Sequence, residues 1–162
     1  MASDAWLDEI ADKAMRELFS CYEVALVERQ DEARLALVHS SAVSFSSDAL
    51  TATVILAMGK KAFAACAPVG IKVADDWIGE LANQLLGRAV NLLCRHGVSG
   101  RMGTPIFFPA ALLAADGERW QPLRFEVASS PVVAAFVWNV APDFVPSETP
   151  DSVMAEGDAV MF

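Results

Sequence analysis

The segment that most constrains the fold is residues 75–96, where apolar residues recur with the period of an α-helix. Its apolar face consists of Ile78, Ala82, Leu85, Ala89, Leu92 and Leu93. Asp75 or Asp76 is expected to cap the start of this helix, and Gly97 follows its last turn. A helix with one long apolar face has to bury that face against another layer, so the segment predicts a packed domain built around it.

The remaining segments predict a second long helix and several strands. Residues 4–28 have an amphipathic helical period, with Ser3 or Asp4 in position to cap it. Turn residues and β-branched residues predict strands over residues 34–45, 50–58, 104–108, 120–127 and 132–140, and a short helix over 60–66. The first two strands would form a hairpin. Together these elements predict an α+β fold, with long helices packed on one face of a largely antiparallel sheet.

The composition fits one folded domain followed by an acidic tail. The chain has 162 residues, of which 54% are hydrophobic and 20% charged, and this balance excludes a disordered chain. Residues 1–145 are predicted to form a single domain, and residues 146–162 a frayed tail that carries four acids and no base. The formal net charge of −9 argues against a nucleic-acid partner, because such binding needs clustered Lys and Arg.

Cysteine usage and the N-terminal sequence predict a cytoplasmic protein. Cys21, Cys66 and Cys94 are widely spaced and form no C-x-x-C pair, which is typical of reduced thiols in a cytosolic core. The first residues are acidic from Asp4 on and resemble no signal peptide. No uncharged apolar run reaches the roughly 18–20 residues needed to cross a bilayer, so no membrane association is expected.

The usual catalytic motifs are missing from the sequence. It has no Walker loop, no G-x-S-x-G and no H-E-x-x-H. His39 falls in a predicted strand, and His96, in the last turn of the long helix, is expected to interact with the carboxyl end of that helix. Two isolated histidines and scattered cysteines make a metal site built by the protein itself improbable, so no cofactor of its own is expected.

The long helix carries an unusual polar stripe opposite its apolar face. Glu80, Asn83, Gly87 and Asn91 follow one another at spacings that put them on one side of an α-helix. Asn and Gly are poor helix formers, and Gly87 costs about 1 kcal/mol relative to alanine in a helix interior. Close approach of another surface would justify that cost, because glycine has no Cβ. A solvated face with a tolerated glycine is the alternative.

The segment Gly79–Ala89 resembles the E-x-x-N-x-x-x-G helix of the CheC/CheX/FliY phosphatases of bacterial chemotaxis. The segment Gly103–Phe108 resembles the short proline-containing strand that follows this helix in the family, and the order of predicted elements fits as well. The single copy of the motif is most similar to the CheX type. One departure is Arg88, which stands where such helices often have Asn.

The resemblance implies that the protein dephosphorylates the aspartyl phosphate of a CheY-like response regulator, whose receiver domain supplies the Mg²⁺. Asn83 would position the attacking water, and Glu80 would pair with the active-site lysine of the receiver. The resemblance also implies contacts with the partner from Gln84, Gly87, Arg88 and Asn91, and a homodimer formed by joining sheet edges. The uncharged strand predicted over residues 132–140 is the expected edge.

Two other functions fit the same residues. One is a binding module on the same fold, docking a receiver or serving a flagellar switch without turnover. The other is a structural or dimerisation domain in which Glu80 and Asn83 are merely solvated.

Overall fold

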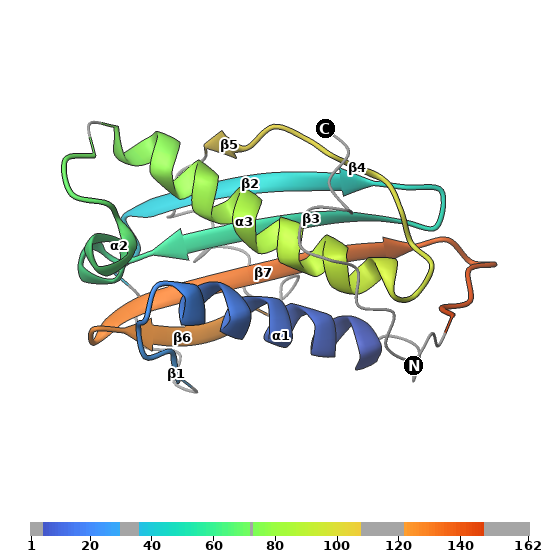
Figure 1. Ribbon diagram of the computed structural model, residues 1–162, viewed down its shortest axis with the longest axis horizontal. Helices are drawn as coiled ribbons and strands as arrows, with labels where there is room; N and C mark the ends of the chain where they lie inside the picture. The colour runs from blue at the N-terminus through green and yellow to red at the C-terminus, as the bar shows by residue number, and fades with distance from the viewer. Residues whose placement is uncertain (1–4, 30–35, 72, 108–121, 148–162) are drawn as a thin grey trace.

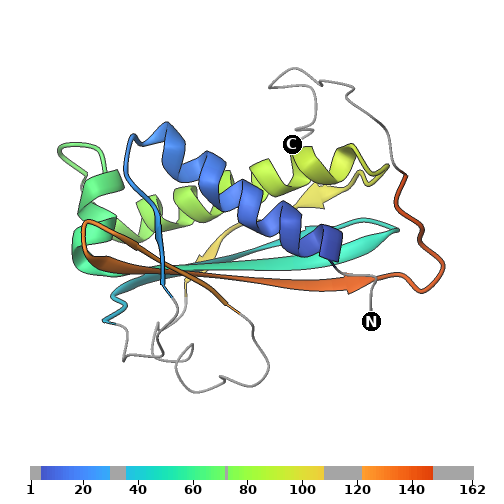
Figure 2. The ribbon, with the colours of Figure 1, turned by 90° about the horizontal axis from the view of Figure 1, so that it is seen from below.

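The protein forms two long helices and a short one over a single sheet, as described by a computed structural model for residues 5–29, 36–71, 73–107 and 122–147. The elements in chain order are α1 (Ala5–Cys21), β1 (Val27–Glu28), β2 (His39–Ser46), β3 (Leu50–Met58), α2 (Lys60–Cys66), α3 (Ala74–Cys94), β4 (Arg101–Met102), β5 (Ile106–Phe107), β6 (Leu123–Val127) and β7 (Ser130–Val140). Figures 1 and 2 show α1 and α3 side by side on one face of the sheet. The predicted α+β fold is therefore confirmed.

The sheet is antiparallel throughout, with the strand order β1-β6-β7-β3-β2-β4, and β5 also pairs with β2. Strand β3 pairs with β2 along its whole length and with β7 from Leu50↔Val140 to Met58↔Val132. Alternate residues of these strands, including Val54, Leu56 and Ala134, face the helices and are buried. The β-branched residues of the strands and the turn residues between them made these strands predictable from the sequence.

Helix α3 is the centre of the core. Every residue of its predicted apolar face is buried, and Leu81, Leu86 and Val90 widen the buried surface. Helix α1 packs beside it through Leu7, Met15 and other buried residues. The two helices thus leave only one narrow side of α3 open to the outside.

The residues at the two ends of α3 explain where this helix begins and ends. The residue before the first turn is Val73, which offers no side-chain cap, so the prediction that Asp75 or Asp76 caps the helix is wrong. The two acids lie inside the first turn, where their negative charges interact favourably with the positive end of the helix dipole. Gly97 follows the last turn with φ 81°, and the Val98 N–H donates to the Leu93 carbonyl at 3.2 Å, a Schellman ending.

Helix α1 is shorter than the predicted range of residues 4–28. It ends at Cys21, and Glu23 adopts a left-handed conformation with φ 56°. Beyond it Val24 and Leu26 pack against the core while the residues between them are exposed, an alternation that suits extended chain. This stretch carries the backbone to the sheet edge, where β1 pairs with β6.

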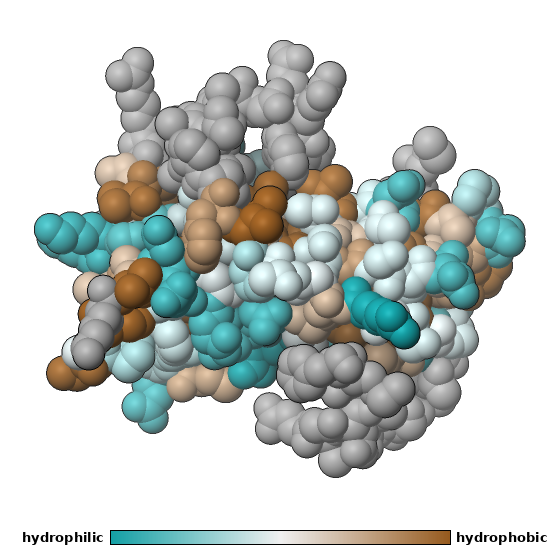
Figure 3. Space-filling model, turned by 90° about the horizontal axis from the view of Figure 1, so that it is seen from above, coloured by the Kyte–Doolittle hydropathy of each residue, from teal (hydrophilic) through white to brown (hydrophobic). Residues whose placement is uncertain are grey.

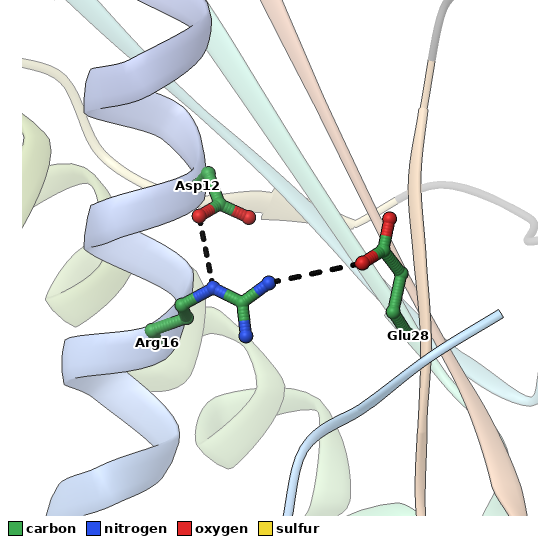
Figure 4. A network of polar contacts seen from close by, with 3 residues as sticks. All are labelled: Asp12, Arg16 and Glu28. Atoms are coloured by element: carbon green, nitrogen blue, oxygen red, sulfur yellow. Dashed lines mark hydrogen bonds and ion pairs between the residues drawn. The ribbon is translucent and has the colours of Figure 1, made fainter.

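A charged network ties α1 to that edge (Figure 4). The Arg16 side chain lies 2.8 Å from a carboxylate oxygen of Asp12 and 4.0 Å from one of Glu28. Its guanidinium also lies 5.7 Å from the centre of the Phe125 ring. Because the three charged side chains are largely exposed, the network orients the β1 segment more than it stabilises the fold.

Strand β7 differs from the expected edge strand. In its first half, Ser130–Ala134, the residues Val132–Ala134 pair with β3 on one side and with β6 on the other, so this part is in the interior of the sheet. The interior place of Ser130–Ala134 follows from a two-residue turn at Ala128 and Ser129, which folds β6 back onto β7. Residues 135–140 keep β3 on one side, and no strand among the described residues flanks the other.

Several expectations lie outside the described residues. These are the Ser3 or Asp4 cap, the starts of the strands predicted at 34–45 and 120–127, Phe108, and the tail beyond Ser147. The division into a domain and a tail at residue 145 therefore stays a prediction. Within the described residues, no helix is both long and apolar enough to cross a membrane.

Candidate functional site

The polar stripe predicted on α3 lies at the surface of the folded chain. Glu80 is exposed, and Asn83, Gly87 and Asn91 are partly exposed. The helix turns these residues outward because Ile78, Leu85 and other apolar residues on its opposite side are buried against α1 and the sheet. A carboxylate and an amide one turn apart are thus both accessible to a partner.

Packing against the described residues does not require a glycine at position 87. A Cβ built at this position would meet no atom within 4 Å. In contrast, a Cβ built on Gly79, two turns earlier, would lie 3.3 Å from the Cβ of Pro105 and 3.6 Å from the Phe107 ring. Gly79 therefore has a structural reason within the fold, whereas Gly87 leaves an open notch on the stripe.

One flank of the stripe is a hydrogen-bonded network. The Tyr22 hydroxyl donates to Oε1 of Gln84 at 2.7 Å, and Nε2 of Gln84 donates to Oε1 of Glu80 at 3.1 Å. The Tyr22 ring packs edge-on against Trp77, with ring centres 6.2 Å apart. Burial raises the pKa of Tyr22, so its hydroxyl is protonated and able to donate at neutral pH.

Arg88 continues this flank towards the end of α1. Its Nη2 lies 3.1 Å from Sγ of Cys21, and its Nε is buried with no hydrogen-bond partner among the described residues. The guanidinium is therefore directed sideways towards α1, while Glu80 is directed outwards. The predicted partner contacts Gln84 and Arg88 are both engaged with the protein's own side chains.

The other flank of the stripe is formed by β5. Pro105 and Phe107 contact α3 at Gly79, one turn before Asn83. Phe107 is 49% exposed and Ile106 is 62% exposed, so apolar surface borders this side of the molecule. Figure 3 looks onto the β5 and β2 edge and shows brown apolar atoms next to teal and pale polar ones. In the described part of the chain, no side chain forms a hydrogen bond with that of Asn83.

The site offers positioning chemistry rather than a nucleophile. The centre of the His39 ring lies 4.0 Å from that of Phe63, and the centre of the His96 ring lies 4.9 Å from that of Trp6. Both histidines therefore pack against aromatic rings. His96 does lie just beyond the end of α3, but its Nδ1 is buried without a partner in the described residues. Those residues also contain no group of three side chains able to hold a metal ion.

The fold was compared with known proteins. No protein-family model and no curated protein matches the sequence. Among solved structures, the chemotaxis protein CheX from Vibrio vulnificus is 13% identical with a TM-score of 0.62, over 86% of this chain and 99% of that one. A CheC-like superfamily protein from Shewanella sp. PV-4 is 17% identical with a TM-score of 0.61, over 86% and 99%.

A third structure is a CheX–CheY–BeF3–Mg²⁺ complex from Borrelia burgdorferi, 13% identical with a TM-score of 0.56, over 83% of this chain and 95% of that one. The class defined by these likenesses is the CheX and CheC-like α+β fold. This chain has that fold along most of its length, as the resemblance of its α3 motif implied.

The sequence did not reveal the residues that surround the stripe. Tyr22 falls within the helical pattern of residues 4–28, and Trp77 lies outside the Gly79–Ala89 motif. Both lie at points where α1 and α3 meet, which depends on how the helices pack. A buried tyrosine needs a hydrogen-bond partner for its hydroxyl. The tyrosine in the amphipathic helical pattern is therefore the one feature of the sequence that points to this network.

Proposed function

We propose that this chain docks through the α3 stripe onto a CheY-like receiver domain and hydrolyses its aspartyl phosphate. The observation that carries the proposal is the accessible Glu80–Asn83–Gly87 stripe, whose glycine has no packing role among the residues that the structure describes. The fold supports it, because one structure with this fold is a complex of CheX with CheY, BeF3 and Mg²⁺. The protein would act in the cytoplasm and as a homodimer.

The proposed mechanism divides the work between the two proteins. Phosphoryl transfer has a loose transition state, so catalysis depends on positioning and on charge stabilisation. The receiver would supply Mg²⁺, the phosphorylated aspartate and a lysine. Asn83 would hold a water in line with the phosphorus, since a neutral amide does not repel the phosphoryl oxygens. Glu80 would pair with the lysine and set the depth at which the helix docks.

The decisive experiment compares loss of phosphate with binding. Asn83→Ala should lower the rate of phosphate loss from a phosphorylated receiver by about 10²–10³, by analogy with the removal of one oxyanion-hole donor. Its affinity for the receiver loaded with BeF3 and Mg²⁺ should change little, as for an interaction made in the transition state. Asp48→Ala, which truncates an exposed side chain between β2 and β3, is the control and should leave both unchanged. Full activity of Asn83→Ala would contradict the proposed mechanism.

A second function is a receiver-binding module without turnover. The observation that favours it is Arg88, which replaces the asparagine often found there and adds a charge beside the site. Single-turnover measurements separate the two functions. A protein that binds the BeF3-loaded receiver but does not accelerate phosphate loss is such a module.

A further inference from the structure

We propose that Tyr22 and Gln84 are positioning residues that hold the Glu80 carboxylate in the orientation needed for docking, a role that rests on the receiver docking proposed above. Glu80 lies on an exposed helix face, where a long side chain is free to adopt several rotamers. Two hydrogen bonds in series connect it to Tyr22, which lies beyond the end of another helix. Glu80 is therefore held by the packing of α1 against α3.

The direction of each hydrogen bond is fixed by the Glu80 carboxylate, which can only accept. A side-chain amide can accept at its oxygen and donate from its nitrogen. The Gln84 nitrogen therefore donates to Glu80, at 3.1 Å, which leaves the Gln84 oxygen to accept from the Tyr22 hydroxyl, at 2.7 Å. Without the hydroxyl, the Gln84 oxygen would lose its donor, and the side chain would be free to turn away from the carboxylate.

Tyr22 is itself well anchored. Its backbone N–H donates to the Phe19 carbonyl at 3.1 Å, and its ring packs edge-on against Trp77. Burial raises the pKa of its hydroxyl, which keeps the donor proton in place through the neutral and mildly alkaline range. The network therefore starts from a fixed group and ends at a surface carboxylate.

The arrangement leaves one carboxylate oxygen for a partner. Gln84 binds Oε1 of Glu80, and no lysine or arginine in the described ranges forms an ion pair with this residue. A cation arriving from the receiver would meet a carboxylate that is already ordered. Ordering a flexible side chain before binding removes a cost that would otherwise weaken the complex.

The test is a double-mutant cycle on the affinity for a receiver loaded with BeF3 and Mg²⁺. Tyr22→Phe removes the hydroxyl but keeps the ring on Trp77, and it should weaken binding about 2- to 10-fold, the cost of ordering one flexible side chain. Gln84→Met, which keeps the length of the side chain without its hydrogen bonds, should weaken binding similarly. In the Glu80→Ala background, Tyr22→Phe should have no further effect.

Three results would overturn the role of Tyr22 and Gln84. If Glu80→Ala weakens binding and neither Tyr22→Phe nor Gln84→Met does, the network has no role in docking and the proposed function stands. If Tyr22→Phe weakens binding equally with and without Glu80, the tyrosine acts independently of the carboxylate. If Glu80→Ala itself binds normally, the proposed docking through the stripe fails.

Discussion

Gly79 and Pro105 lie so close together that a Cβ built on Gly79 would be 3.3 Å from the Cβ of Pro105. No side chain separates α3 from the segment leading into β5 at this point. Asn83 is one helical turn further along and therefore lies between β5 and the flank formed by Tyr22 and Gln84. The contact fixes where the candidate water-positioning amide stands relative to the sheet.

The two glycines should respond differently to the same substitution. Gly87→Ala should raise the free energy of unfolding by about 1 kcal/mol, because alanine favours the helix and its Cβ meets nothing. Gly79→Ala should gain less or lose stability, since its Cβ approaches Pro105 closely. Denaturant titration measures both changes. Equal gains at the two positions would contradict the assigned packing.

A larger side chain at Gly87 should separate docking from stability. Gly87→Leu should abolish binding of the BeF3-loaded receiver by filling the notch, while the melting temperature is maintained or increased. Binding can be measured by titration calorimetry and melting by circular dichroism. Undiminished binding would mean that the partner does not approach this part of α3.

The turn between β6 and β7 should be stabilised by glycine. Ala128 and Ser129 have φ values of 51° and 60°, a conformation that glycine adopts without steric cost. Ser129→Gly should raise the free energy of unfolding by about 0.5–1 kcal/mol. The control is Ser46→Gly in strand β2, which should lower the free energy of unfolding by a similar amount. The backbone is extended there, so glycine only adds conformational freedom to the unfolded chain.

The thiols of Cys21 and Cys66 should differ in reactivity and in how they change the stability of the protein at high pH. Burial raises the pKa of Cys66 from 9.0 to about 11, whereas Cys21 is exposed. At pH 8 a thiol reagent should label Cys21 in the native protein and Cys66 only after unfolding.

Between pH 9 and 11 the unfolded chain loses a proton that folded Cys66 keeps, so stability should fall as the pH rises. Cys66→Ala should reduce that fall in urea titrations at pH 8 and 10.5.

Homodimer formation should involve the second half of β7. Residues 135–140 carry no charge, and Val137 is 41% exposed beside an edge that no described strand covers. We expect a dimer in sedimentation at micromolar concentration, and a weaker one for Val137→Lys. A wild-type monomer under these conditions would contradict the expectation.

The helix and strand periods in the sequence predicted most of the fold because burial follows them closely. All six residues of the predicted α3 face are buried, and the β2–β3 hairpin forms as expected. The start of α3 and the end of α1 were not predicted correctly. After α1 the chain runs to the sheet edge, where β1 pairs with β6, and no local pattern encodes this long-range pairing.

The candidate site could be predicted only along one helix. The spacing of Glu80, Asn83 and Gly87 shows in sequence because it is local. The contact of Gln84 with Tyr22 joins residues 62 positions apart, and no local pattern encodes it. The place of β7 was missed for the same reason, since an apolar strand without charges is equally consistent with an interior or an edge position.

The interior position of β7 has a consequence for synthesis. Strand β3 ends at Met58, but its partner Val132 is added 74 residues later, about 4–15 s at usual translation rates. During that interval the β2–β3 hairpin and α3 can assemble, while one side of β3 has unsatisfied backbone groups. A nascent chain of this fold would thus present an open apolar edge to chaperones until its final strand closes the middle of the sheet.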